Sequence, residues 1–98
     1  MVVIRVFLKV KASLRNDFLI HMNEQQVLVP NHFSGCDSFR VFQDTTDESQ
    51  FVLYEEWENE DALAKYKESQ TFQHNSDVLF PMLEGKPNSA YFRAERFL

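Results

Sequence analysis

Apolar and polar residues alternate along residues 2–11, and residues 50–57 form a second, largely apolar stretch. Alternation with a period of two is typical of a strand, because successive side chains point to opposite faces. In the first stretch one face is uniformly valine, isoleucine and leucine and should meet the helices, whereas the other mixes Phe7 with Arg5 and Lys9. In the second stretch both faces carry large apolar groups, which predicts an interior strand covered on two sides.

A helical spacing of apolar residues follows the first strand. Phe18, Met22 and Val29 fall on one stripe of a helix, and the hydroxyl of Ser13 can cap its first turn. We therefore expect a helix from Ser13 to about Val29, ended by the turn-forming residues 30–35.

The remaining sequence predicts two more strands and two more helical segments. These are strands at 37–44 and 88–97, a hairpin loop at 45–49, a helix at 60–69 capped by Asn59, and a second helical stretch from residue 71 that Pro81 should kink or end. The resulting order, β-α-β-β-α-β, is the α+β ferredoxin-like arrangement, a four-stranded antiparallel sheet with helices on one face. We expect residues 1–98 to form this single domain.

The second face of the predicted sheet has no helix to cover it. Phe7 and the side chains on the same face of the other strands would meet water unless something covers them. In a chain of 98 residues the simplest cover is a second copy of the same sheet, so we expect a homodimer with two-fold symmetry.

Charge and composition narrow the classes of partner. The formal net charge of −5 argues against nucleic acid, and the absence of a large Lys/Arg cluster argues against an anionic membrane surface. The single cysteine, Cys36, allows no intrachain disulfide framework and is typical of a reducing cytoplasm, where we expect the protein to act. The apolar start is interrupted by Arg5 and Lys9, which indicates a strand and not a signal peptide.

Aromatic residues make up 14% of the chain, including ten phenylalanines. They predict an aromatic-lined cavity, apolar surface given to a partner, or simple core filling. The residues expected to enclose a flat apolar ligand are Phe18, Met22, Trp57, Phe72 and Phe80, and the polar residues expected beside it are His21, Tyr66 and His74. The alternative is that Trp57 and Tyr66 only complete the core.

Other catalytic chemistries have little support in the sequence. The three histidines are far apart and form no ligand pair one helical turn apart, so we expect no metal. With two glycines the chain has no phosphate-binding loop for a nucleotide cofactor. Cys36 is interpreted as a small filler in a turn more readily than as a nucleophile. Glu55 and Glu56 should point to opposite faces, so they cannot act together as a paired acid and base.

Several of these features resemble one family. The strand-to-helix sequence YEEW-ENEDALAKYKES, the Gly35-Cys36 turn and the β-α-β-β-α-β order are similar to the antibiotic biosynthesis monooxygenase domain, whose members are small dimeric α+β barrels. The most specific part is the motif E-x-W-x(5)-L, formed by Glu55, Trp57 and Leu63. The family includes cofactor-independent oxygenases of electron-rich phenols and quinols, haem-degrading enzymes and small-molecule isomerases.

The chain departs from the family at two places. Members with this kind of helix often carry a histidine nine residues after the tryptophan, where this sequence has Tyr66. The haem-degrading branch uses an asparagine on the first strand, where this sequence has Arg5 and Val6, although His74 lies near the position of its axial histidine. We therefore expect neither haem nor any other cofactor.

The resemblance implies a monooxygenase that oxidises a quinol-like or polyketide-like aromatic with dioxygen. His21 or His74 would be the base, since the unperturbed pKa of histidine is suited to that task, while Tyr66 would orient the substrate oxygen and Trp57 would stack on the ring.

Two alternatives remain open. One is an isomerase or lyase of a small carbonyl compound, whose phosphate Arg5, Arg40 or Arg93 could hold. The other is a dimer that binds a small molecule without turning it over.

Overall fold

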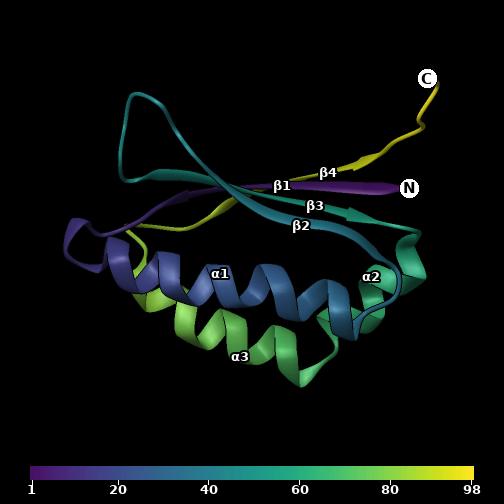
Figure 1. The fold of residues 1–98 in the computed structure, drawn as a ribbon, viewed down its shortest axis with the longest axis horizontal. Helices are drawn as coiled ribbons and strands as arrows, with labels where there is room; N and C mark the ends of the chain where they lie inside the picture. Colours follow the sequence, from purple (N-terminus) through teal and green to yellow (C-terminus); the bar gives the residue numbers. More distant parts are fainter.

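The computed structural model describes residues 1–98 as one antiparallel sheet with all helices on a single face (Figure 1). Its elements are β1 (Val2–Lys9), the 3-10 turn η1 (Ala12–Leu14), α1 (Arg15–His32), β2 (Cys36–Gln43), β3 (Gln50–Trp57), α2 (Glu60–Lys67), α3 (Gln70–Leu79), the 3-10 turn η2 (Phe80–Met82) and β4 (Asn88–Arg93). The strand order is β2-β3-β1-β4, and every neighbouring pair is antiparallel. This confirms the ferredoxin-like α+β fold.

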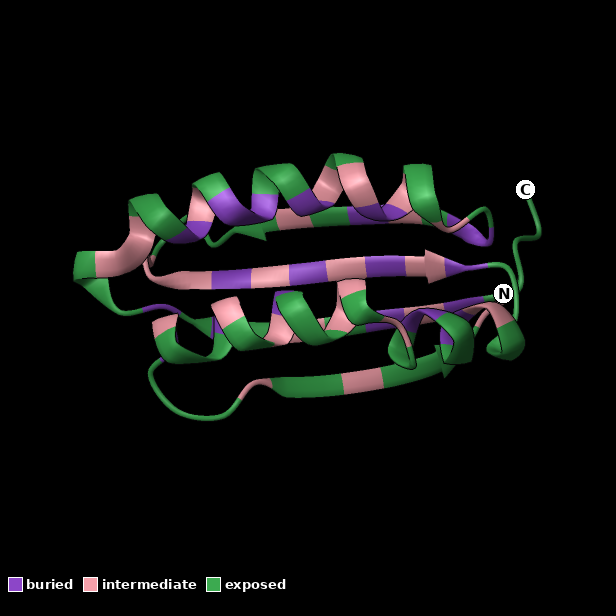
Figure 2. Cartoon of the chain, turned by 90° about the horizontal axis from the view of Figure 1, so that it is seen from below, coloured by how far each residue is buried: buried purple, intermediate pink, exposed green.

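The strand register decides which side chains meet the helices. Ile4 pairs with Glu55 on one side and with Tyr91 on the other, so these three share the inner face of the sheet. Burial along β3 alternates residue by residue (Figure 2), with the inward residues buried and the outward ones half-buried. The inner face and the helices enclose a core of 16 buried apolar residues, in which Phe18 of α1 packs against Phe51 of β3 with ring centroids 4.6 Å apart.

Helix α1 differs from its prediction at both ends. Ser13 does not cap it: the residue lies in η1, and the N-terminus of α1 has no side-chain cap. The helix also continues past Val29 and Pro30 to His32. Proline removes only one hydrogen bond near the last turn, and the Phe33 amide still donates to the Val29 carbonyl at 3.0 Å. The predicted end at Val29 was therefore wrong.

Strand β4 is shorter than predicted, because it ends at Arg93 and not at Phe97. Its partner β1 begins at Val2, which pairs with Arg93, so no strand remains for later residues to pair with. One further contact, from the Ala94 amide to the Met1 carbonyl at 2.9 Å, closes the ladder before the chain leaves the sheet (Figure 1).

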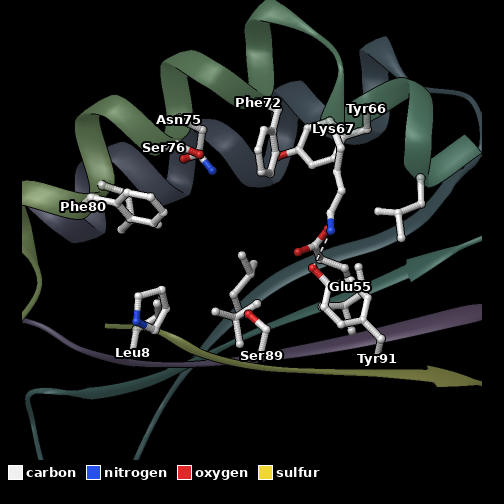
Figure 3. A pocket seen from close by; sticks show the side chains of 16 residues that line it. Leu8, Glu55, Tyr66, Lys67, Phe72, Asn75, Ser76, Phe80, Ser89 and Tyr91 are labelled. Carbon is white, nitrogen blue, oxygen red and sulfur yellow. Dashed lines mark hydrogen bonds between the residues drawn. The ribbon is translucent and has the colours of Figure 1, made fainter. Parts of the chain in front are cut away.

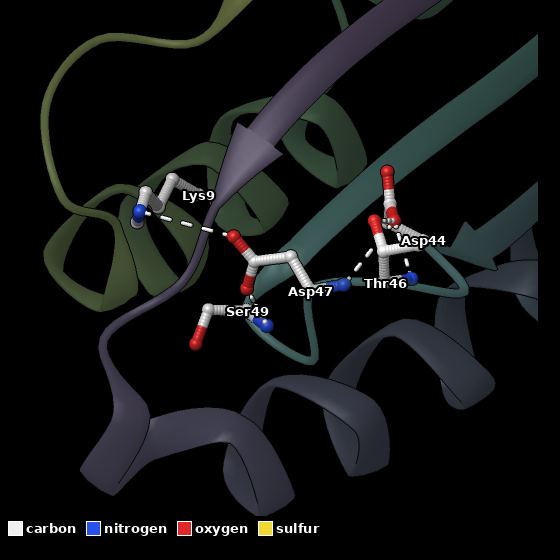
Figure 4. A network of polar contacts seen from close by, with 5 residues as sticks. All are labelled: Lys9, Asp44, Thr46, Asp47 and Ser49. Carbon is white, nitrogen blue, oxygen red and sulfur yellow. Dashed lines mark hydrogen bonds and ion pairs between the residues drawn. The ribbon is translucent and has the colours of Figure 1, made fainter.

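The polar loop between β2 and β3 forms the predicted hairpin (Figure 4). Oδ1 of Asp44 accepts hydrogen bonds from the amides of Thr46 at 2.7 Å and Asp47 at 3.2 Å, and these bonds lower the pKa of Asp44. Oδ1 of Asp47 accepts from the Ser49 amide at 2.9 Å, and its Oδ2 lies 4.0 Å from Lys9 Nζ. The loop thus satisfies its own backbone groups and turns the chain back into β3.

The outer face of the sheet carries exposed aromatic side chains. Phe7, Phe42 and Phe92 are 43%, 53% and 43% exposed. The Arg5 guanidinium lies between two of them, 5.8 Å from the ring centroid of Phe7 and 4.8 Å from that of Phe92. No helix covers this face (Figure 1). None of the helices is both long enough and apolar enough to cross a membrane.

Candidate functional site

A cavity of about 110 Å³ lies between the inner face of the sheet and helices α2 and α3 (Figure 3). Its apolar wall is formed by aliphatic residues of β1, β3 and both helices, together with Phe72 and Phe80. Its polar residues are Glu55, Tyr66, Lys67, Asn75, Ser76, Ser89 and Tyr91. Pockets for small molecules usually have this composition, in which a few polar groups interrupt a mostly apolar lining.

Glu55 is a carboxylic acid on a strand face that is otherwise apolar. It is 6% exposed, and its Oε1 accepts a hydrogen bond of 2.9 Å from Trp57 Nε1. Burial raises the pKa of Glu55 to about 7, although the bond from Trp57 and the charge of Lys67 oppose that rise. A carboxyl group with this pKa exchanges its proton near neutral pH, as a general base or acid must.

Lys67 is the only cation that lines the cavity. It comes from the last turn of α2 and reaches toward Glu55 and Tyr91 (Figure 3). Its Nζ donates to the Tyr91 hydroxyl at 2.5 Å and lies 4.3 Å from the centroid of that ring. Lys67 makes no ion pair with an acidic side chain, so its charge remains available to an anion in the cavity.

Tyr66 presents a buried phenol to the cavity. Its side chain is 2% exposed and stacks on Trp57 with ring centroids 4.9 Å apart. Burial raises the pKa of Tyr66, the negative charge of Glu55 raises it further, and a hydrogen bond from the Asn75 side chain opposes both. Tyr66 therefore stays protonated at neutral pH and can donate a hydrogen bond to a ligand.

Asn75 is held from behind by His21. The two side chains belong to α3 and α1, and His21 Nε2 donates to Asn75 Oδ1 across 2.7 Å in a buried contact. Because that carbonyl oxygen is already engaged, the amide nitrogen is the part of Asn75 left to serve the cavity. His21 thus fixes the orientation of a cavity residue and does not itself line the cavity.

The predicted site residues occupy three different environments. Those that line the cavity are Tyr66, Phe72 and Phe80. Those that lie behind its lining, in the core or between helices, are Phe18, His21, Met22 and Trp57. His74 is exposed on α3, with its ring centroid 6.4 Å from that of His21, and it does not line the cavity.

Sequence reasoning missed six polar residues of the cavity: Glu55, Lys67, Asn75, Ser76, Ser89 and Tyr91. A signal existed for Glu55, because its place in the β3 alternation set a carboxylate among buried apolar residues, where an unpaired charge is rarely found. Lys67 gave no such signal, since a lysine in the last turn of a helix is ordinarily a solvated charge. Tyr91 was on a predicted strand whose register was unknown.

Other candidate groups lie outside the cavity. Arg5 and Arg40 are on the outer face of the sheet, and Arg93 forms an exposed ion pair with Glu60 at 2.7 Å. Burial raises the pKa of Cys36 to about 12, which leaves the thiol protonated and a poor nucleophile. No group of three His, Cys, Asp or Glu side chains is arranged to hold a metal ion.

The sequence matches a known protein family and a named relative. The family model described as "Antibiotic biosynthesis monooxygenase" matches residues 1–76. The Bacillus subtilis (strain 168) protein named "Putative monooxygenase YcnE" is 32% identical over 75 residues, which cover 74% of this chain and 76% of that protein.

Solved structures of relatives share the fold over almost the whole chain. A structure from Caulobacter crescentus CB15 has a TM-score of 0.91 at 20% identity, covering 97% of this chain and 90% of its own. One from Deinococcus radiodurans has a TM-score of 0.88 at 16% identity, covering 100% of this chain and 96% of its own. Both are named as putative antibiotic biosynthesis monooxygenases. From the family match and the Bacillus relative, the chain belongs to the antibiotic biosynthesis monooxygenase family.

Proposed function

We propose that the protein is a monooxygenase that oxidises a small quinol-like aromatic with dioxygen and uses no cofactor. The observation that carries this proposal is the buried carboxyl group of Glu55. It has a pKa of about 7 and lines a mostly apolar cavity together with one cation, Lys67. The family and the named activity of the Bacillus relative support an oxygenase, and the residues of the cavity supply a base and an anion-binding group.

The reaction begins with a proton transfer. Glu55 takes a proton from a ring hydroxyl, and Lys67 and the Tyr66 hydroxyl stabilise the quinolate that forms. The apolar walls keep that anion away from water, so the interactions with Lys67 and Tyr66 are stronger than they would be in solution. These roles replace the histidine base that the sequence predicted, because neither His21 nor His74 lines the cavity.

The quinolate then reduces dioxygen directly. One electron passes to dioxygen, the resulting superoxide and semiquinone combine at a ring carbon, and the hydroperoxide loses water. Overall, one hydroquinone and one dioxygen give one hydroxyquinone and one water. The ring provides all four electrons that dioxygen accepts, so the reaction needs no external reductant.

The size of the cavity favours a single ring over a multi-ring polyketide. An engineered apolar cavity of about 150 Å³ is large enough to bind benzene. The cavity here is smaller, at about 110 Å³. Phe80 is 55% exposed, so a small movement of its side chain can admit one substituted ring.

Oxygen uptake with a panel of hydroquinones tests the proposal. The expected result is one dioxygen consumed per quinol, with one atom of labelled oxygen in the organic product and the other in water. Protein-free solutions measure spontaneous oxidation of the quinol, and protein treated with a chelator and freed of flavin and haem tests independence from cofactors. Uptake no faster than in protein-free solution would contradict the proposal.

An isomerase of a small carbonyl compound is the second candidate. The approach of Lys67 to Glu55 favours it, because the carboxylate can move a proton while the ammonium holds an enolate. None of the three arginines that could hold a phosphate lines the cavity, so the substrate would be unphosphorylated. Product formation without oxygen uptake would favour this reaction, and ligand-dependent stabilisation without any turnover would favour a binding protein.

A two-fold homodimer through the outer sheet face forms the second part of the proposal. Three exposed phenylalanines on one face are more apolar surface than a monomer of this size usually shows. Sedimentation equilibrium should give a dimer, and Phe42→Asp should give a folded monomer by placing a charge in the interface. Phe97→Asp, outside the sheet, is the control and should leave the dimer intact. A wild-type chain that sediments as a monomer at micromolar concentration would contradict this part.

A further inference from the structure

A second hollow of about 410 Å³ lies on the other side of one wall of the cavity. It is open to solvent, and it is lined by Val2, Glu60, Phe92 and Arg93 together with three residues that also line the cavity: Leu63, Lys67 and Tyr91. These three residues, which we term the partition, are all that the two spaces share.

Tyr91 is the only member of the partition that is neither part of the hydrophobic core nor a group with a role in the proposed chemistry. Leu63 is 8% exposed and belongs to the hydrophobic core, whereas Lys67 is the proposed anion-binding group. Tyr91 is 50% exposed and stands on an edge strand, where its ring has solvent on one side and the cavity on the other.

The Tyr91 ring is held in place and does not hang free. Tyr91 pairs with Ile4 on the neighbouring strand β1, and paired residues point to the same face, so the Tyr91 side chain lies on the inner face of the sheet. Lys67 Nζ then fixes the ring through the 2.5 Å hydrogen bond to the hydroxyl and the 4.3 Å contact with the ring. One residue further on, Phe92 points to the outer face, so no neighbour can take the place of Tyr91.

We propose that Tyr91 sets the size limit of the ligand, by closing the cavity against the outer hollow at the width of one aromatic ring. With the ring present, a ligand has about 110 Å³. Without it, only Leu63 and Lys67 stand between the cavity and the hollow of about 410 Å³, so we expect the two to join beside them. A fused two-ring ligand then keeps one ring in the cavity and places the second in the hollow. The inference rests on the proposed function only in that the cavity binds a flat ring.

Binding of two ligands that resist oxidation tests the size limit without requiring turnover. Resorcinol has one ring and naphthoresorcinol has two, and isothermal titration calorimetry measures the affinity of each. Wild type should prefer resorcinol. In Tyr91→Ala, the affinity for naphthoresorcinol should rise by about tenfold or more relative to the affinity for resorcinol. A ratio of this size is typical of a steric limit in an apolar pocket. Circular dichroism melts check that each variant is folded, as the exposure of Tyr91 leads us to expect.

Two control variants separate the ring of Tyr91 from its neighbours. Tyr91→Phe keeps the ring and loses the hydrogen bond to Lys67, so it should keep the preference of wild type for resorcinol. Glu60→Ala enlarges the outer hollow and leaves the partition and the outer sheet face intact, so it should also keep that preference. An unchanged ratio in Tyr91→Ala would overturn the proposal, and so would a Tyr91→Phe variant that admits two rings as readily as Tyr91→Ala.

The outcomes also separate this inference from the proposed oxygenase. A protein that binds resorcinol but consumes no oxygen with any hydroquinone loses the proposed reaction and keeps the size limit. A protein that consumes oxygen with one-ring quinols, and whose Tyr91→Ala variant gains no affinity for two rings, keeps the reaction and loses the size limit. If no variant binds either ligand, the size limit is overturned whatever the oxygen uptake.

Discussion

The two faces of the sheet are built from the same strands and have opposite characters. Glu55 and Glu56 are adjacent residues of β3, and the alternation of the strand sends the first into the cavity and the second to the outer face. Burial beside apolar walls raises the pKa of Glu55 to about 7. Glu56 instead accepts a hydrogen bond from the Tyr54 hydroxyl on the outer face. Which carboxyl group lines the cavity therefore depends on the register of β3 in the sheet, because a shift of one residue would place Glu56 in the cavity and Glu55 on the outer face.

The largest expected effect comes from changing this pair one residue at a time. Glu55→Gln keeps an oxygen that can accept from Trp57 but removes the base, so the rate of quinol oxidation should fall by about 10²–10⁴-fold. The matched variant Glu56→Gln should keep nearly the full rate. The rate of the wild type should rise with pH and level off above an apparent pKa of about 7, since only the ionised Glu55 accepts a proton. Equal losses in the two variants would remove the distinction between the faces.

The ionisation of Glu55 should also affect folding stability, but in the opposite direction to the reaction rate: as the pH rises, stability should fall. The pKa of Glu55 is raised from 4.5 to about 7 by folding, so the folded chain keeps this proton while the unfolded chain has lost it. Its contribution to stability is therefore fully present below pH 4.5 and is lost as the pH rises to about 7. Above that range the loss amounts to about 3 kcal/mol.

Glu55→Gln carries no such charge. Relative to wild type, the variant should gain little below pH 4.5 and about 3 kcal/mol above pH 7 in chemical denaturation. Glu56→Gln again serves as the control. A Glu55→Gln variant without any pH-dependent gain would show that Glu55 is solvated in the folded protein, and the raised pKa would have no basis. The gain in stability with loss of activity is the trade-off expected of a functional site.

His21 should have a smaller effect than Glu55, because it acts through Asn75. His21→Leu leaves the buried Asn75 oxygen without its donor, which should cost about 1–3 kcal/mol of stability. Activity should fall less than in Glu55→Gln, and the fall should appear in KM more than in the pH profile. His74→Leu is the matched control: it removes the exposed histidine on α3 and should change neither quantity. A loss of the pH profile in His21→Leu would make His21 the base, as the sequence first indicated.

The sequence predicted the fold well because the fold follows from local periodicity. The two-residue alternation of β1 and β3 and the cap at Asn59, which accepts from the Ala62 amide at 2.8 Å, are local features that tertiary contacts did not alter. The ends of α1 and β4 were wrong because they depend on what lies nearby in space. The exact extent of β4, for example, is set by the first residue of β1.

The site was harder to predict, because its polar residues come from four separate elements. The sequence showed that Glu55 and Glu56 point to opposite faces, but not which of them enters the cavity, nor that Lys67 of α2 and Tyr91 of β4 would line it too. Phe72 and Phe80 were predicted as lining and do line the cavity, whereas Trp57 lies behind Tyr66. Residue type and helical spacing can identify the buried face of a helix. Which side chains of that face line the cavity is decided by how the helices pack on the sheet.

The smallest expected effect belongs to the outer face. Arg5→Gln removes the cation that lies over Phe7 and Phe92, a contact worth about 0.5–1 kcal/mol at an exposed site. If the chain is monomeric, denaturation should show a loss of that size and no dependence on protein concentration. If two copies close over this face, the same change should weaken the dimer, and the loss should grow as the protein is diluted. Arg15→Gln, which breaks an exposed ion pair with Glu48 away from the sheet, is the control and should show no concentration dependence. A concentration-independent effect of Arg5→Gln in a protein that sediments as a dimer would place the interface on another surface.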